Sequence, residues 1–146
     1  IVEPSVFLSN HPANTGTRSH FYADLEEFTT GNFVPDPGAY MKSWTCGEIA
    51  QEANGWTGRN YERWCNPDFD ALYVESTRQV DPELRKQLFI QMNDMIINNV
   101  VLIPVGHRAE VFGVSNTLQG VDLTPWDENT WNIQDWTRQQ GERAAP

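Results

Sequence analysis

Basic residues are scarce in this sequence of 146 residues: ten lysines and arginines stand against twenty aspartates and glutamates, and the formal net charge is −10. Nucleic-acid phosphates are bound by clusters of positive charge, so this balance excludes a nucleic-acid-binding protein. Long apolar runs are missing too. The longest, residues 100–105, contains Pro104 and falls far short of the roughly 18 residues that a spanning helix needs. We therefore expect no membrane insertion by this segment.

Motifs of catalysis and metal binding are also lacking. The three histidines, His11, His20 and His107, form no His-Glu-x-x-His pattern, and no serine lies in a Gly-x-Ser-x-Gly turn. No phosphate-binding loop is present, and two cysteines cannot complete a zinc site by themselves. The sequence therefore predicts no enzyme, no bound metal and no cofactor.

Only two cysteines occur, Cys46 and Cys65, and they do not form a Cys-x-x-Cys pair. A disulfide between them is the simplest explanation, and it implies an oxidising compartment. The alternative is two buried free thiols in a cytosolic protein.

Aromatic residues, in contrast, are abundant, with six Trp, four Tyr and seven Phe. Four of them surround the cysteines: Trp44, Trp56, Tyr61 and Trp64. Such a group either lines a ligand site or covers a small core beside a disulfide. From the sequence alone we favour the core.

Three helices share the same start signal, an Asp or Asn followed by proline. The Asx side chain accepts a hydrogen bond from a free backbone N–H, and proline at the first helical position loses nothing by lacking one. The signal stands at Asp36, Asn66 and Asp81. We expect helices from residue 37 to about 50, from residue 67, and from residue 82 to 98. Their apolar faces comprise Tyr40, Met41 and Trp44; Phe69, Leu72 and Tyr73; and Leu84, Leu88, Met92, Met95 and Ile96.

Short strands are expected at residues 5–9, 20–28, 100–105 and 110–114, the last two around a turn at residues 106–107. Residues 115–136 are expected to form a loop and residues 137–146 a fraying tail. The whole pattern predicts a mixed α/β fold.

Asp24 is the candidate binding residue. In an extended strand it shares a face with Tyr22, so its carboxylate could receive a ligand ammonium while the ring forms an apolar wall. The other interpretation is an ordinary surface aspartate at the end of a strand, and from the spacing alone we favour it.

The order of these motifs resembles one known family. An aromatic-x-x-Asp segment (residues 21–24) is followed by Asp-Pro, Cys46, Trp64-Cys65, Asn-Pro-x-Phe-Asp (residues 66–70), and Asp-Pro with an amphipathic helix. This order is similar to the C-terminal part of solute-binding protein family 5, the bacterial extracytoplasmic solute-binding proteins of the dipeptide/oligopeptide transport class. The resemblance covers residues 6–136, and members are several times longer, so it implies a fragment of such a protein.

The resemblance implies a two-lobed periplasmic-binding-protein fold of type II. Most of residues 1–105 would belong to the second lobe, residues 106–136 would return towards the first, and residues 137–146 would form a flexible tail. In related peptide binders, the Asp of a Trp-x-x-Asp segment pairs with the peptide α-amine. Asp24 inherits that role here, with Tyr22 and with Phe21 in place of the Trp. Some members also pair cysteines in the order of Cys46 and Cys65.

The implied function is capture of peptides, or of similar small solutes, for an ABC importer in the cell envelope. The partners are then the solute and the transporter permease. Nickel chelates and oligosaccharides are other solutes of the family, so the solute stays open. The alternative from another class is a secreted carbohydrate-binding module, which the tryptophans, the acidity and the disulfide would also suit. Such a module is expected to be a β-sandwich, and three Asx-Pro helices argue against it.

Overall fold

The computed structural model describes residues 2–9, 11, 13, 15–31, 34–107, 109, 111–124 and 129–139. The chain divides into two compact units. Unit 1 comprises Ile1–Asn32 and Asp36–Val105, and unit 2 comprises Phe33–Pro35 and Gly106–Pro146. Helices dominate the first unit and a two-stranded sheet lies in the second, which is compatible with the α/β class.

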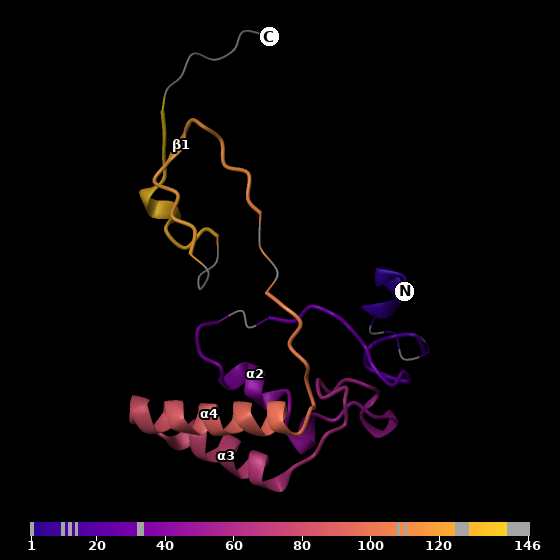
Figure 1. The fold of residues 1–146 in the computed structure, drawn as a ribbon. Coiled ribbons are helices and arrows are strands. Elements are labelled where there is room, and N and C mark those ends of the chain that lie inside the picture. The colour runs from indigo at the N-terminus through magenta and orange to yellow at the C-terminus, as the bar shows by residue number, and fades with distance from the viewer. Residues whose placement is uncertain are drawn as a thin grey trace. The chain divides into compact units, whose positions relative to one another are not determined.

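Unit 1 is built on two antiparallel helices, α3 (Pro67–Arg78) and α4 (Pro82–Asn98), with the short α2 (Gly38–Lys42) packed against both. Figure 1 shows these helices together, with α3 and α4 side by side. Three shorter elements complete the unit: α1 (Pro4–Phe7) and the 3₁₀ turns η1 (Cys46–Glu48) and η2 (Glu52–Asn54). In the described part of the chain, no helix has both the length and the apolar character needed to cross a bilayer.

The Asx-Pro signals do mark helix starts. The side-chain oxygen of Asn66 accepts from two backbone N–H groups of α3 at 2.9 and 3.4 Å, and that of Asp81 accepts from two of α4 at 2.9 and 3.0 Å. Asp36 accepts from the N–H of Gly38 at 2.7 Å. The caps of α3 and α4 each replace a hydrogen bond that the first turn cannot make within the helix. The short α2 has no such cap: it begins at Gly38, and the residue before it is Pro37. The predicted starts of α3 and α4 are therefore confirmed.

The core of unit 1 forms where the three helices meet. Phe69 and Met92 are completely buried there, and Leu84, expected on the same face of α4, is 56% exposed. Removing such large side chains from water stabilises a fold by about 1.5–3 kcal/mol each. The buried cluster is Met41, Trp44, Phe69, Phe89, Met92 and Ile96.

The first helix ends at Lys42 and does not reach residue 50 as expected. Contacts beyond the helix explain the early end. The hydroxyl of Thr45 donates to the carbonyl of Lys42 at 2.9 Å, and the N–H of Cys46 donates to the Asp70 carboxylate on α3 at 3.0 Å. With these bonds the chain turns away from the helix axis and buries Trp44 in the core.

The expected strands of unit 1 are wrong. Residues 5–9 fall in and after α1, because the N–H groups of Val6 and Phe7 both donate back to the Glu3 carbonyl at 2.9 Å. Residues 20–28 join no ladder, and Phe21 has a φ of +41°. Val100, directly after α4, has a φ of +54°, and residues 100–105 form no strand either. Alternation indicates only which side chains share a face. A strand also needs a partner, and among the described residues these segments pair with no other strand.

Unit 2 contains one antiparallel pair, β1 (Leu118–Gln119) and β2 (Thr137–Arg138), with the 3₁₀ turn η3 (Ile133–Asp135) between them. Asn132, 4% exposed, organises this unit: its amide donates to the Gly120 carbonyl at 2.7 Å and accepts from the Trp136 indole at 2.8 Å.

The expectations for this part of the chain were partly wrong. Two residues of the expected tail, Thr137 and Arg138, form β2. Residues 111–114 of the expected last strand are not in a strand, and residues 110, 126 and 140–146 lie outside the described residues.

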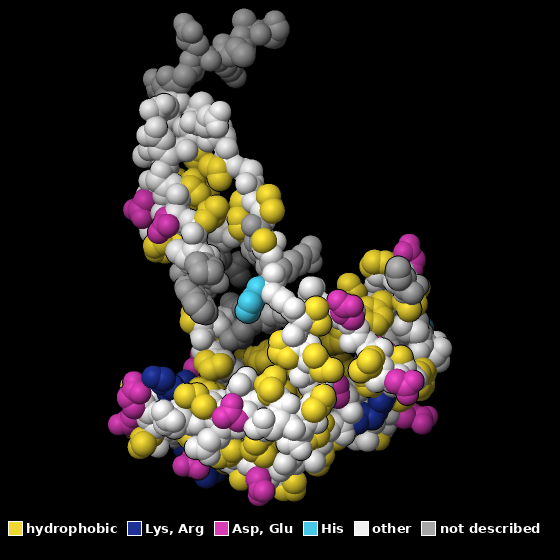
Figure 2. Space-filling model, viewed as in Figure 1, with side chains coloured by type: hydrophobic (Ala, Val, Ile, Leu, Met, Phe, Trp, Pro, Cys, Tyr) yellow, Lys and Arg dark blue, Asp and Glu magenta, His cyan; other side chains and the backbone are white. Residues whose placement is uncertain are grey.

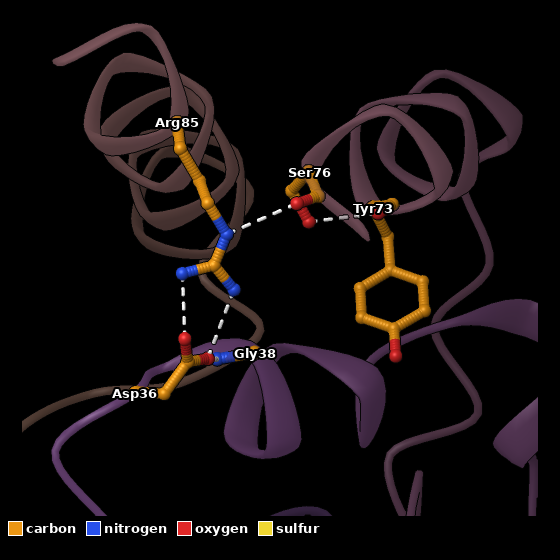
Figure 3. A network of polar contacts seen from close by, with 5 residues as sticks. All are labelled: Asp36, Gly38, Tyr73, Ser76 and Arg85. Carbon is orange, nitrogen blue, oxygen red and sulfur yellow. Dashed lines mark hydrogen bonds and ion pairs between the residues drawn. The ribbon is translucent and has the colours of Figure 1, made fainter. Parts of the chain in front are cut away.

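A polar network on unit 1 ties the start of α2 to the other two helices (Figure 3). The Arg85 guanidinium donates to both carboxylate oxygens of Asp36, at 2.5 and 3.1 Å, and to the Ser76 carbonyl at 3.0 Å. It also lies 4.6 Å from the centre of the Phe89 ring. The hydrogen bond from Arg85 lowers the pKa of Asp36 below its usual value. This network is structural, since its groups are all engaged with one another.

Apolar side chains are common on the surface of the chain (Figure 2). Val80 and Val111 are each 92% exposed, and Leu25 is 79% exposed. Single exposed apolar side chains are normal on protein surfaces, so these exposures by themselves do not mark a binding site.

Candidate functional site

The segment of residues 20–24 carries the three residues expected to bind a ligand. Phe21 is half-buried, Tyr22 is 70% exposed, and Asp24 is exposed. Because this segment is not a strand, alternation does not place Tyr22 and Asp24 on one face. The physical basis expected for the pair is therefore wrong, although both side chains reach solvent.

Tyr22 is the exposed end of a row of contacting side chains that continues through His20 and Trp56 to Arg63. The rings of Tyr22 and His20 are nearly parallel, with centroids 5.7 Å apart, and the His20 ring lies 4.1 Å from that of Trp56. The Arg63 guanidinium follows at 5.5 Å from the Trp56 centroid. His20 is only 2% exposed. The exposed Tyr22 ring thus lies beside the buried His20 ring, and the Trp56 ring contacts His20 at a tilt of 48°.

Arg63 connects this segment to the disulfide loop. Its guanidinium donates to the carbonyl of His20 at 2.5 Å, to that of Ala50 at 3.2 Å, and more weakly to that of Phe21 at 3.5 Å. Hydrogen bonds from a charged donor are stronger than neutral ones. One side chain therefore holds three backbone groups from two separate parts of unit 1.

The expected disulfide between Cys46 and Cys65 is present, and joins the end of the α2 region to the start of α3. Beside it, Trp44 is buried in the core and Trp64 packs edge-on against Phe69 with centroids 5.2 Å apart. These two tryptophans confirm the core interpretation for half of the aromatic group around the cysteines.

The other two aromatic residues of that group, Trp56 and Tyr61, lie outside the core. Trp56 belongs to the row of contacting side chains that ends at Tyr22. Tyr61 lies 6.2 Å from the Phe28 ring, with the Arg18 guanidinium 5.3 Å from its own centre. The four aromatic residues have similar surroundings in the sequence, and only the fold separates the two core residues from the other two.

Two further carboxylates raise the negative charge near this segment. Burial raises the pKa of Glu26, the charge of Glu62 raises it further, and Arg63 opposes both. One buried oxygen of Glu26 has no hydrogen-bond partner in the described part of the structure. Burial is also the main cause that raises the pKa of Glu62. The pKa of Tyr40 is raised by burial and by the charge of Glu62. Burial is the main cause of both carboxyl shifts, and the positive charge of Arg63 partly offsets it at Glu26.

Sequence reasoning missed His20 and Arg63. His20 carries no motif, and the one visible sign of Arg63 was its place directly before Trp64-Cys65. Within the described ranges, no three His, Cys, Asp or Glu side chains are grouped so that they could hold a metal ion. The arrangement can present the Asp24 carboxylate and the Tyr22 ring from a segment whose backbone is hydrogen-bonded to Arg63.

The β-sandwich expected for a carbohydrate-binding module is not what the described residues form. Their named strands are two residues long, and unit 1 is helical. The burial of Trp44 also removes one of the rings that such a module would need at its surface.

Three curated proteins are similar to parts of the chain. A dipeptide-binding protein of Pseudomonas aeruginosa PAO1 is 23% identical over 114 residues, which cover 64% of this chain and 21% of that protein. Di/tripeptide-binding protein 4 of P. aeruginosa UCBPP-PA14 is 32% identical over 76 residues, covering 51% of this chain and 14% of that protein. Di/tripeptide-binding protein 1 of the same strain is 23% identical over 74 residues. No family model and no solved structure matches.

The chain therefore spans about a fifth or less of the length of these relatives. All three are named as binding proteins, which fits the expectation that the chain is not an enzyme. The partial similarities support a relationship to peptide-binding proteins.

Proposed function

We propose that this chain is part of a substrate-binding protein that captures peptides, or similar small solutes, outside the cytoplasm and delivers them to an ABC importer. The partial similarity to dipeptide-binding proteins and the order of motifs from residue 21 to residue 98 support this function. The disulfide is consistent with an oxidising compartment. Unit 1 is then part of the second lobe of the receptor, and unit 2 begins the return to the first.

Asp24 is the residue that receives the peptide α-ammonium in this proposal. An ammonium that leaves water without a counter-charge is costly to bury, and a carboxylate supplies that charge. The observation that carries the assignment is an exposed Asp24 three residues after Phe21, the last residue whose carbonyl accepts from Arg63. Tyr22 and Phe21 flank the ligand, and the acidic side chains of Glu26 and Glu62 add negative potential.

Substituting Asp24→Asn tests this role, because asparagine keeps the shape and removes the charge. The intact protein that contains this chain is titrated by calorimetry with a dipeptide and with its N-acetylated form. Breaking one partner of a buried, hydrogen-bonded charge pair costs about 2–5 kcal/mol, or roughly thirty- to several-thousand-fold in affinity. Wild type should prefer the free amine by a factor in this range, and the variant should lose most of that preference.

Glu27→Gln is the matched control. Glu27 is exposed and three residues from Asp24, so the substitution removes the same charge close to the site. This variant should keep the wild-type preference. An Asp24→Asn protein that still prefers the free amine, or a control that loses the preference equally, would contradict the assignment.

A further inference from the structure

We infer that Arg63 is the positioning residue of this binding site: it fixes the backbone from which Tyr22 and Asp24 project. This inference rests on the proposed function of Asp24. Arg63 lies 39 positions after Asp24 in the chain, and it donates to the carbonyls of His20 and Phe21.

The shape of the guanidinium suits this task. It donates along three directions, with Nε on the Ala50 carbonyl, Nη2 on that of His20 and Nη1 on that of Phe21. Its central carbon lies over the Trp56 ring at the same time, 5.5 Å from the centroid. A lysine keeps the charge, but its ammonium neither forms this fork nor stacks in the same way. The arrangement therefore depends on arginine and not only on a positive charge.

The backbone around Arg63 is strained where it meets the segment. Four non-glycine residues of the described chain have positive φ, and three of them belong to this cluster: Phe21 at +41°, Trp56 at +62° and Arg63 itself at +57°. Side chains with a Cβ rarely adopt this conformation, and it persists only where the surrounding contacts enforce it. Such strain gathers at binding sites, where it preorganises the groups that meet a ligand. Here the shared contact is the Arg63 side chain.

Burial changes abruptly at the point that Arg63 holds. Thr17, Ser19 and His20 are between 2% and 6% exposed, whereas Tyr22 is 70% exposed. The carbonyls of His20 and Phe21, which accept from Arg63, mark this boundary. The residue thus anchors the last buried part of the chain, and the ligand-binding side chains extend from that anchor into solvent.

The test substitutes Arg63→Lys in the intact protein, with Arg59→Lys as the matched control. Arg59 is an exposed arginine of the same loop, so both changes keep the charge. The first measurement is amide hydrogen exchange at residues 18–20, whose N–H groups are all hydrogen-bonded at 3.1 Å. Loss of charge-assisted bonds should speed exchange there by about tenfold or more in Arg63→Lys, with α3 and α4 unchanged. Arg59→Lys should match wild type.

The second measurement is the free-amine preference described above. Arg63→Lys should reduce it by about tenfold or more, and adding the substitution to Asp24→Asn should reduce it no further, because both act through the same contact. If Arg63→Lys does not fold, Trp56→Leu removes the surface under the guanidinium and should cause smaller changes in the same direction.

Unchanged exchange at residues 18–20 would overturn the inference, and so would faster exchange throughout α3 and α4, which would indicate a general loss of stability. Equal loss of affinity for both peptides would overturn it as well. If wild type itself binds both peptides alike, the role proposed for Asp24 fails, and the exchange result alone then decides whether Arg63 anchors the segment.

Discussion

Asn60 should be one of the most important residues for the stability of unit 1. It is completely buried between the two segments that the disulfide joins. Its side-chain amide donates to the carbonyls of Trp44, Thr45 and Trp64 at 3.3, 3.1 and 2.7 Å. Its backbone also forms a bridge to Ile49 on the neighbouring segment. Substituting Asn60→Ala removes every side-chain bond and leaves this backbone bridge in place.

The expected loss follows from counting donors. An amide has two hydrogens, so the three acceptors share two full bonds, each of which contributes about 1 kcal/mol net. The carbonyls that lose their donor add a desolvation cost of about 1 kcal/mol or more. We therefore expect Asn60→Ala to lower the free energy of unfolding by about 3 kcal/mol. This is a large part of the roughly 5–15 kcal/mol that stabilises a typical domain.

Urea unfolding followed by tryptophan fluorescence measures this loss. With a slope of about 1–3 kcal/mol per molar urea, the midpoint should fall by about 1 M or more. Asn99→Ala is the control. Asn99 is exposed at the end of α4 and its amide makes one bond, to the Met95 carbonyl at 2.8 Å. This control should cost about 1 kcal/mol or less. A loss below about 1 kcal/mol for Asn60→Ala would refute the reasoning.

Two other perturbations have defined outcomes. Thiol titration in denaturant should find Cys46 and Cys65 oxidised, and reduction should cost about 3 kcal/mol, the chain entropy of a loop with a sequence separation of 19; two reactive thiols in protein purified without reductant would contradict this. Asp36→Asn should keep the hydrogen bond from the Gly38 N–H but lose the ion pair with Arg85, at a cost of about 0.5–1 kcal/mol near pH 7 because Asp36 is half-exposed. The pKa of Asp36 is lowered in the fold, so this stabilisation is present above about pH 4 and disappears as the pH falls through the lowered value. Stability curves of both proteins against pH should converge in acid, and curves that stay apart would refute the pairing.

The helices of unit 1 were predictable because their signals are local. A capping Asx, a proline at the first position and apolar residues at helical spacing all lie within one element, as α4 shows from Asp81 to Ile96. The end of α2 was not predictable in this way. It depends on a hydrogen bond between Cys46 and Asp70, which are 24 positions apart.

The strand predictions were wrong for the same reason, because strand pairing also depends on residues far apart in the sequence. Alternating residues at 20–28 predict a face but no partner, and the carbonyls at the start of this segment bond to the side chain of Arg63 instead of a neighbouring strand. The candidate ligand residues stay a prediction, which was made from a local aromatic-x-x-Asp motif. Their supports, His20 and Arg63, are brought together only by the fold.

The structure of the intact protein with a bound dipeptide tests the central proposal most directly. The decisive measurement is the distance from the peptide α-ammonium nitrogen to the nearest carboxylate oxygen of Asp24. Our account predicts about 2.7–2.9 Å, the length of a charge-assisted hydrogen bond, with Tyr22 beside the ligand. A dipeptide whose ammonium is held by another group, while Asp24 stays in solvent, would contradict it.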